Sequence, residues 1–78
     1  MLDYNMSGII LFYRFWHGQT VLHKLCLRQD AAVEMLRIFV EAGADVNGCN
    51  NYQETPLMFA AKRGSSSLCR FLLENGGY

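Results

Sequence analysis

Apolar residues recur at helical spacing in the last third of the chain, in two stretches on either side of a run of serines. In the first stretch Leu57, Ala60 and Ala61 stand at i, i+3 and i+4, so they share one face of a helix. Thr55 and Pro56 suit its start, because a threonine hydroxyl caps backbone N–H groups and a proline loses no hydrogen bond there. The pattern predicts a short helix that ends at the basic pair and glycine before the serines.

A second apolar stripe follows the serine run. Its members are Leu68, Cys69, Leu72 and Leu73. The serines favour a turn and a helix start, and the glycines after Asn75 favour a helix end. The sequence therefore predicts a second helix, over 67–74, that runs antiparallel to the first.

The same pattern occurs upstream, so the chain contains an internal repeat. The closing glycines, Gly43 and Gly76, lie 33 residues apart, and the opening threonines, Thr20 and Thr55, lie 35 apart. The upstream copy therefore carries two extra residues between its helices, near 28–30. Its second helix is expected over 31–42.

A repeat near 33 residues, with a TPLH-like opening and a closing G-A-D-V-N, resembles the ankyrin repeat. The residues that carry the resemblance are Gly18, Thr20, Leu22, His23, the run 41–47, Thr55-Pro56-Leu57, Ala60-Ala61, Gly64, Leu72-Leu73 and Gly76. The resemblance implies an all-α ankyrin-repeat solenoid. It would comprise two helix-turn-helix repeats, over residues 18–47 and 48–78, joined by a β-hairpin-like loop.

The resemblance also implies a structural role for His23, which stands at the histidine of the TPLH motif and would tie neighbouring loops by hydrogen bonds. Met58 takes the matching position in the second copy, where we expect packing to replace that bond. In the connecting loop, Asn50-Asn51 suits the positive-φ positions of a tight turn.

Residues 1–17 form an atypical apolar N-terminal segment, in which Ile9–Trp16 is apolar and aromatic except for Arg14. The run is shorter than the roughly 20 residues needed to cross a bilayer. It also lacks the basic start and the cleavage site of a signal peptide. We therefore expect neither a membrane span nor a signal peptide.

Two conformations of this segment remain open. Gly8 precedes Thr20 by 12 residues, as Gly43 precedes Thr55, which favours the hairpin of a degenerate repeat. A helix is the alternative, because several apolar residues between 6 and 16 also share one helical face.

Composition narrows the class of protein. The chain has 78 residues, enough for one small and marginally stable domain. Seven basic and seven acidic residues cancel, which gives no electrostatic case for nucleic acid binding. The three cysteines show no CxxC spacing, and Cys26 and Cys69 fall on apolar helix faces, which favours the cytoplasm or nucleus.

No catalytic motif is present, so we expect no enzyme activity and no cofactor. His17, His23 and Cys26 lie close in sequence, but a structural zinc ion needs about four ligands. We therefore expect no metal site.

The ankyrin resemblance implies a non-catalytic module that binds a partner protein or peptide on its concave face. By position in the repeat, the binding residues would be Trp16, His17, Gln19, Lys24, Leu27, Arg28, Asn51, Tyr52, Glu54, Phe59, Lys62 and Arg63. Aromatic and arginine side chains of this kind often dominate binding energy. Asn47 is a candidate hydroxylation site, since some ankyrin repeats are modified at this asparagine.

Two other hypotheses remain open. One is that the chain is a fragment of a larger ankyrin adaptor that self-associates or assembles through its open repeat ends, because two repeats without polar caps are marginal. On this view the outer face of the second repeat, including Leu57, Leu68 and Phe71, is partly open to water. Membrane-surface contact through Ile9–Trp16 is the third hypothesis.

Overall fold

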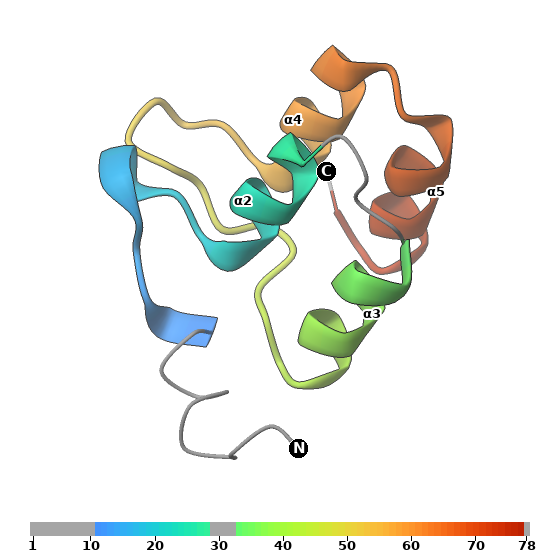
Figure 1. Cartoon of the computed structure of the whole chain (residues 1–78), viewed down its shortest axis with the longest axis horizontal. Helices are drawn as coiled ribbons and strands as arrows, with labels where there is room; N and C mark the ends of the chain where they lie inside the picture. The colour runs from blue at the N-terminus through green and yellow to red at the C-terminus, as the bar shows by residue number, and fades with distance from the viewer. Residues whose placement is uncertain (1–10, 29–32, 78) are drawn as a thin grey trace.

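The computed structural model describes residues 11–28 and 33–77, which form an all-helical fold (Figure 1). The elements are a 3-10 turn η1 (Trp16–Gly18) and the helices α2 (Val21–Leu27), α3 (Val33–Glu41), α4 (Pro56–Arg63) and α5 (Ser66–Glu74). No β-strand occurs within these two described stretches. The predicted all-α class and the four predicted helices are therefore confirmed.

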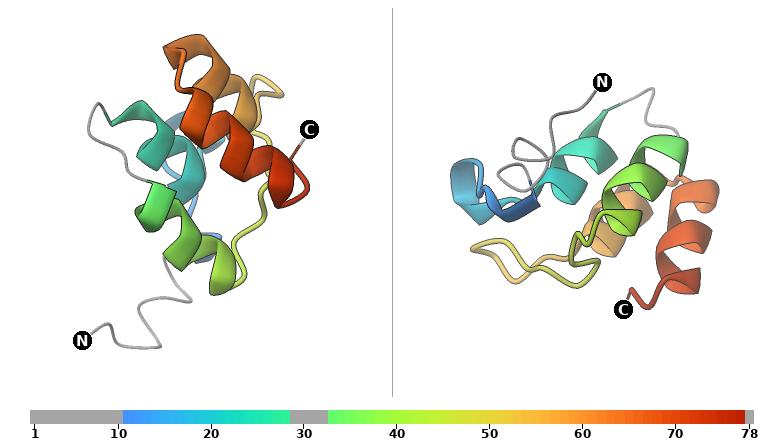
Figure 2. Two further views of the ribbon diagram at one scale, coloured as in Figure 1. Left: turned by 90° about the vertical axis from the view of Figure 1, so that its right-hand side faces the viewer. Right: turned by 90° about the horizontal axis from the view of Figure 1, so that it is seen from below.

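The helices form two pairs that stack side by side (Figures 1 and 2). Within the pairs α2 packs on α3 and α4 on α5, and between the pairs α2 packs on α4 and α3 on α5. We call α2 and α4 the inner helices and α3 and α5 the outer helices. The loops before α2 and before α4 project on the side of the inner helices, away from the outer ones (Figure 1). The exact limits of the two repeats, 18–47 and 48–78, remain a prediction.

Side-chain caps start three of the four helices, as the sequence pattern predicts. The hydroxyls of Thr20, Thr55 and Ser65 each accept a hydrogen bond from the backbone N–H three residues further on. Pro56 occupies the first turn of α4, and Gly64 ends that helix in the left-handed conformation at φ +73°. These local signals fix where the helices begin and end.

The core lies between the two pairs and draws on all four helices. Leu22, Cys26, Leu36, Ala60 and Leu72 are fully buried within it. A domain this small depends on such residues, because it buries only about 60% of the surface that its unfolded chain exposes.

The expectation of an open outer face was wrong for two of its three residues. Leu68 and Phe71 are only 2% and 6% exposed, because α5 turns them toward α3 and the core. The guanidinium of Arg37 on α3 lies 5.3 Å above the Phe71 ring. Leu57 is partly buried, and the exposed apolar residue of α5 is instead Leu73, at 56%.

The predicted positive-φ turn at Asn50-Asn51 was also wrong. In that loop the residue with positive φ is Gln53, at +63°, which matches Gly18, at +74°, in the loop before α2. Asn50 shapes the turn with its side chain, whose Oδ1 accepts hydrogen bonds from two later backbone N–H groups. The positive φ of Gly18 favours glycine, and a Cβ there would also push the Asn51 side chain aside.

The two loops share a backbone hydrogen-bond pattern at the 35-residue offset. Phe15 N donates to Gln19 O at 2.7 Å, and the matching Asn50 N donates to Glu54 O at 3.0 Å. In the N-terminal segment Leu11 and Phe12 are helical, and residues 13–15 are not. The remainder of the hairpin or helix prediction falls on residues 1–10, outside the described part of the chain.

Candidate functional site

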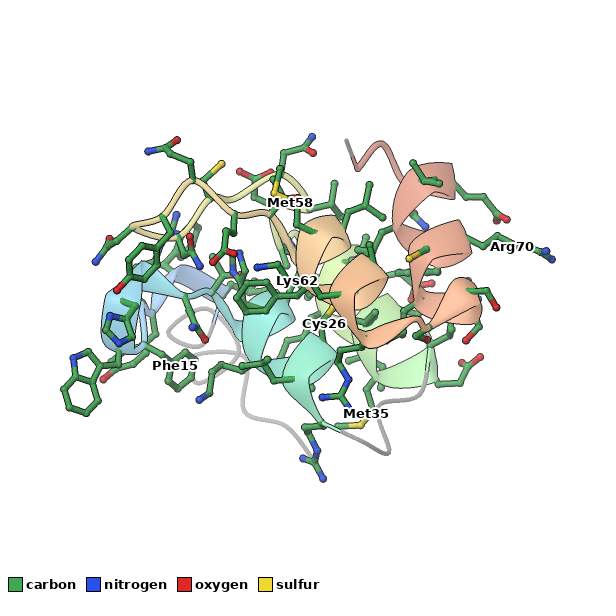
Figure 3. The ribbon with its side chains drawn as sticks, turned by 90° about the horizontal axis from the view of Figure 1, so that it is seen from above. Phe15, Cys26, Met35, Met58, Lys62 and Arg70 are labelled. Carbon is green, nitrogen blue, oxygen red and sulfur yellow. The ribbon has the colours of Figure 1, made fainter. Side chains whose placement is uncertain are left out.

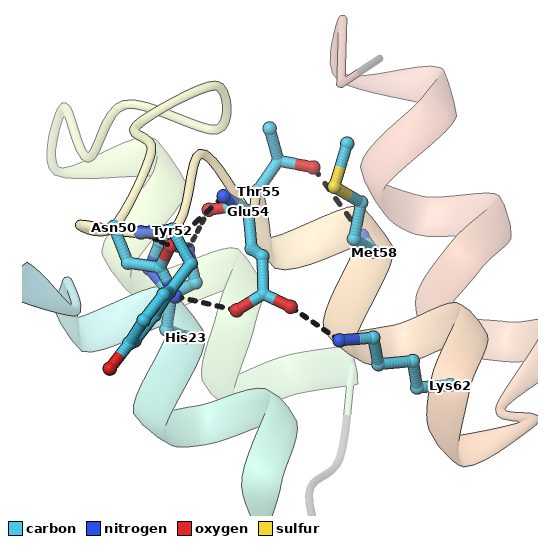
Figure 4. Close-up of polar contacts among 7 residues, drawn as sticks. All are labelled: His23, Asn50, Tyr52, Glu54, Thr55, Met58 and Lys62. Carbon is cyan, nitrogen blue, oxygen red and sulfur yellow. Dashed lines mark hydrogen bonds and ion pairs between the residues drawn. The ribbon is translucent and has the colours of Figure 1, made fainter. Parts of the chain in front are cut away.

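His23 joins the first helix pair to the loop of the second (Figure 4). Its Nδ1 accepts a hydrogen bond from Thr20 N at 3.0 Å, so the proton of the neutral ring sits on Nε2. Nε2 then donates to Glu54 O at 2.7 Å. The geometry agrees with the structural role that the TPLH motif implies, because one buried ring caps α2 and holds the next loop.

Burial is the main cause that lowers the pKa of His23 from its ordinary value of 6.5, and the hydrogen bond to the Glu54 carbonyl opposes it. The ring is therefore neutral at neutral pH, as its hydrogen bonds require. Stability that depends on the neutral ring is present above pH 6.5 and is lost as the pH falls below it.

Asn50 organises the loop tip before α4 (Figure 4). Its Oδ1 accepts from Tyr52 N and Glu54 N, both at 2.9 Å, and its Nδ2 donates to Glu54 Oε1 at 3.0 Å. The other carboxylate oxygen of Glu54 pairs with Lys62 on α4. The hydrogen bonds from Asn50 and Lys62 lower the pKa of the Glu54 carboxyl. The network ties the loop tip to the inner helix.

The two loop tips contact each other and present a row of three rings. Asn51 N donates to His17 O at 2.8 Å, and the Tyr52 hydroxyl lies 3.2 Å from His17 Nδ1. The His17 ring stacks on Trp16, with centroids 5.8 Å apart, and lies 5.5 Å from the Tyr52 ring. Trp16 is 86% exposed and Tyr52 63% exposed. We call Trp16, His17 and Tyr52 the tip rings.

Arg14 also bridges the loops, and the sequence analysis missed its role. Its Nη1 donates to Gly18 O at 3.0 Å and to Cys49 O at 2.8 Å. The available signal was a single arginine inside an otherwise apolar run, because its several N–H donors can bind nearby carbonyl oxygens. Because this group holds both loops, the tip rings belong to one connected surface.

The inner helices contribute exposed basic side chains next to the tips. Lys24 Nζ lies 5.6 Å from the Phe15 ring centroid, and Lys62 Nζ lies 5.8 Å from that of Phe59 (Figure 3). Arg63 donates to Leu27 O at the end of α2. This contact links the ends of the two inner helices.

Most of the predicted binding residues are at least partly exposed. Exposed or partly exposed are Trp16, His17, Gln19, Lys24, Leu27, Arg28, Asn51, Tyr52, Glu54, Lys62 and Arg63. Phe59 is the exception and corrects the prediction: it is 7% exposed and meets the His23 ring edge-on at 4.9 Å. It therefore packs in the core rather than facing a partner.

Asn47 lies away from these tips. Its Nδ2 donates to Gly76 O at 3.0 Å, and its backbone N donates to Asp45 Oδ1 at 2.9 Å. The side chain is exposed and links the loop after α3 to the end of α5. Hydroxylation there remains a prediction.

The buried Cys26 thiol is poorly suited to covalent chemistry. Burial raises the pKa of the Cys26 thiol to about 11, which suppresses the reactive thiolate. Among the described side chains, no three from His, Cys, Asp and Glu are grouped to hold a metal ion. No described helix has the length and apolar character to span a bilayer.

The chain belongs to the ankyrin-repeat family: the family model "Ankyrin repeats (3 copies)" matches residues 5–78. The chain is 37% identical over 60 residues to the E3 ubiquitin-protein ligase KEG of Arabidopsis thaliana, covering 77% of the chain and 4% of KEG. It is 41% identical over 44 residues to the ankyrin repeat domain-containing protein oryK of Aspergillus oryzae, covering 56% of the chain and 7% of that protein. No solved structure matches the chain significantly.

The chain thus spans a small fraction of the curated relatives that it matches, and the alignments relate its repeats rather than whole proteins. Ankyrin repeats generally mediate protein–protein interactions and are generally non-catalytic, and their stacked units form extended concave binding surfaces. This general role is the class of function that the family assigns to the chain.

Proposed function

We propose that the chain binds a partner protein or peptide on the concave face formed by the loop tips and the inner helices, with no catalysis of its own. The observation that carries the proposal is the row of tip rings. Trp16 and Tyr52 are large, exposed aromatic residues, the type that most often anchors interfaces. Three free cysteines favour a reducing compartment, so we place this function in the cytoplasm or nucleus.

The surroundings of the tip rings support this role. His17 lies between the other two rings and bonds to Tyr52, while Asn51 and Arg14 join the two loop backbones. A surface held in this way loses little conformational entropy when a partner docks, which favours affinity.

Alanine at Trp16 or Tyr52 is expected to weaken partner capture at least about tenfold, the cost of about 1.4 kcal/mol at a hot spot. The melting temperature is expected to change little, because both side chains are mostly exposed. The measurement is quantitative pull-down from cell lysate with mass spectrometry, beside thermal unfolding of each variant.

Ile38→Ala is the matched control, since Ile38 is 54% exposed on an outer helix and lies in neither proposed binding surface. We expect some proteins to be captured by the wild type and by this control but not by either tip variant. Identical capture by all four chains would contradict the proposal.

A second candidate function is assembly through the open end of the stack, as part of a larger ankyrin adaptor or with another copy. The internal repeat supplies the observation. His23, Cys26 and Leu36 are fully buried in the first pair, where the second pair covers them. The matching residues of the second pair are Met58 at 45% exposure, Ala61, also exposed, and Cys69, partly buried.

A shallow hollow of about 550 Å³ lies on this uncovered face, lined in part by Ala61, Cys69 and Leu73. The first pair indicates that another helix pair of the same kind would fit over such a face. Sedimentation velocity tests this: we expect a concentration-dependent dimer that Leu73→Asp abolishes. A monomer at every concentration would remove self-association from consideration.

A further inference from the structure

The charges that cancel in the sequence are distributed unequally between the two helix layers. The inner helices contain Lys24, Lys62 and Arg63 and no acidic residue, and Arg28 directly follows α2. The outer helices contain three glutamates, Glu34, Glu41 and Glu74, and two arginines, Arg37 and Arg70. Figure 3 shows Arg70 on α5 pointing away from the rest of the molecule, on the far side from Phe15. We call Lys24, Arg28, Lys62 and Arg63 the basic strip.

Helix-end electrostatics alone does not account for this distribution. Cations near the last carbonyls of α2 and α4 do stabilise the helix dipole. The outer helices, however, have no basic residue in their last turns and end in Glu41 and Glu74, the unfavourable sign. The inner helices therefore carry only positive charges, whereas the outer helices carry charges of both signs.

Two cations of the basic strip, Lys24 and Lys62, contact the loops that carry the tip rings. Lys24 rests over Phe15, one residue before Trp16, and Lys62 pairs with Glu54, two residues after Tyr52. Leu27, whose carbonyl oxygen accepts a hydrogen bond from Arg63, is 44% exposed. One surface thus combines spaced positive charges with exposed apolar and aromatic groups.

Resting on the proposed concave-face function, we propose that the partner is an acidic polypeptide segment that also carries apolar side chains. Its carboxylates would meet the basic strip, and its apolar side chains would meet Leu27 and the tip rings. A polypeptide fits better than a nucleic acid for two reasons. The Glu54 carboxylate lies within the face, where it repels a continuous phosphate backbone but can be avoided by the spaced carboxylates of a peptide, and a strip of only four cations releases few counterions.

The test is selection from a phage-displayed library of random peptides of about 12 residues, long enough to cross both inner helices when extended. Selections are run on the wild type, on Lys24→Glu and on Arg70→Glu, which is the matched charge reversal in the outer layer. Far-UV circular dichroism of both variants checks that they fold.

We expect peptides enriched in aspartate and glutamate from the wild type and from Arg70→Glu, and loss of that enrichment with Lys24→Glu. By fluorescence anisotropy, a synthetic consensus peptide should bind at least about tenfold more tightly than its Gln/Asn counterpart, and less tightly at higher salt. Lys24→Glu should weaken it about tenfold and Arg70→Glu less than about twofold.

Each other outcome overturns the inference in a different way. Peptides that need Tyr52 but show no acidic enrichment would refute the inference and leave the concave-face function intact. If no selected peptide depends on Trp16 or Tyr52, both proposals fail. Tighter binding of a dT oligonucleotide than of any peptide, lost with Lys24→Glu, would make the strip a nucleic-acid surface instead.

Discussion

Replacing His23 with alanine is expected to lower the free energy of unfolding by about 3 kcal/mol or more. The ring is fully buried, caps α2 through Thr20, and donates to Glu54 O in the next loop. Its removal opens a cavity beside Phe59 and leaves the buried Thr20 N–H without its acceptor. A domain of this length has only about 4–12 kcal/mol of stability, so this substitution removes about a quarter of it or more.

Met58→Ala is the matched control for this substitution. Met58 occupies the corresponding repeat position, and its side chain is 45% exposed. Urea unfolding followed by far-UV circular dichroism should show a loss of less than about 1 kcal/mol for Met58→Ala. Similar losses for both variants would show that the ring's cross-repeat contacts contribute little.

The pH dependence of the wild type gives an independent check on the same side chain. The folded state lowers the pKa of His23, so below pH 6.5 the unfolded chain takes up a proton that the folded chain resists. The contribution of His23 to stability should therefore be constant above that pH and fall as the solution is acidified. His23→Gln should flatten this slope, whereas the lowered pKa of Glu54 acts only in more acidic solution, below its ordinary 4.5.

Helix positions were predictable because their signals are local. Thr20, Thr55 and Pro56 act on the backbone within one turn, and a glycine ends α4 wherever that helix packs. The orientation of α5 was less predictable, because periodicity defines an apolar face without saying which helix covers each edge of it. The packing of α5 against α3 buries Phe71 and leaves Leu73 exposed.

The candidate site depended more on tertiary contacts than the helices did. The repeat offset placed Trp16 and Tyr52 on neighbouring tips, and both are exposed. The same offset wrongly assigned Phe59 to the surface. A sequence offset carries no information on tertiary contacts, and in the structure the His23 ring packs against Phe59. The basic strip could not be predicted from the net charge of the chain. Net charge sums all residues, whereas a partner contacts only the charges of one helix layer.

Leu22→Ala and Leu57→Ala are expected to differ strongly although they occupy the same position in the two repeats. Leu22 is fully buried beneath the second helix pair, so its truncation should cost about 3–5 kcal/mol. Leu57 is only partly buried, and its truncation should cost about 1–2 kcal/mol. Thermal or urea unfolding at low protein concentration measures both values.

The difference between the two leucines reports what a neighbouring repeat contributes by covering this face. If the cost at Leu57 rises with protein concentration, a second copy covers the open end, as assembly through that end requires. If the cost of Leu57→Ala stays small at every concentration, no second copy covers the open end in solution. The concave face is then the remaining proposed interaction surface. Equal costs in dilute solution would contradict the structure, because they would require Leu57 to be as deeply packed as Leu22 within a single chain.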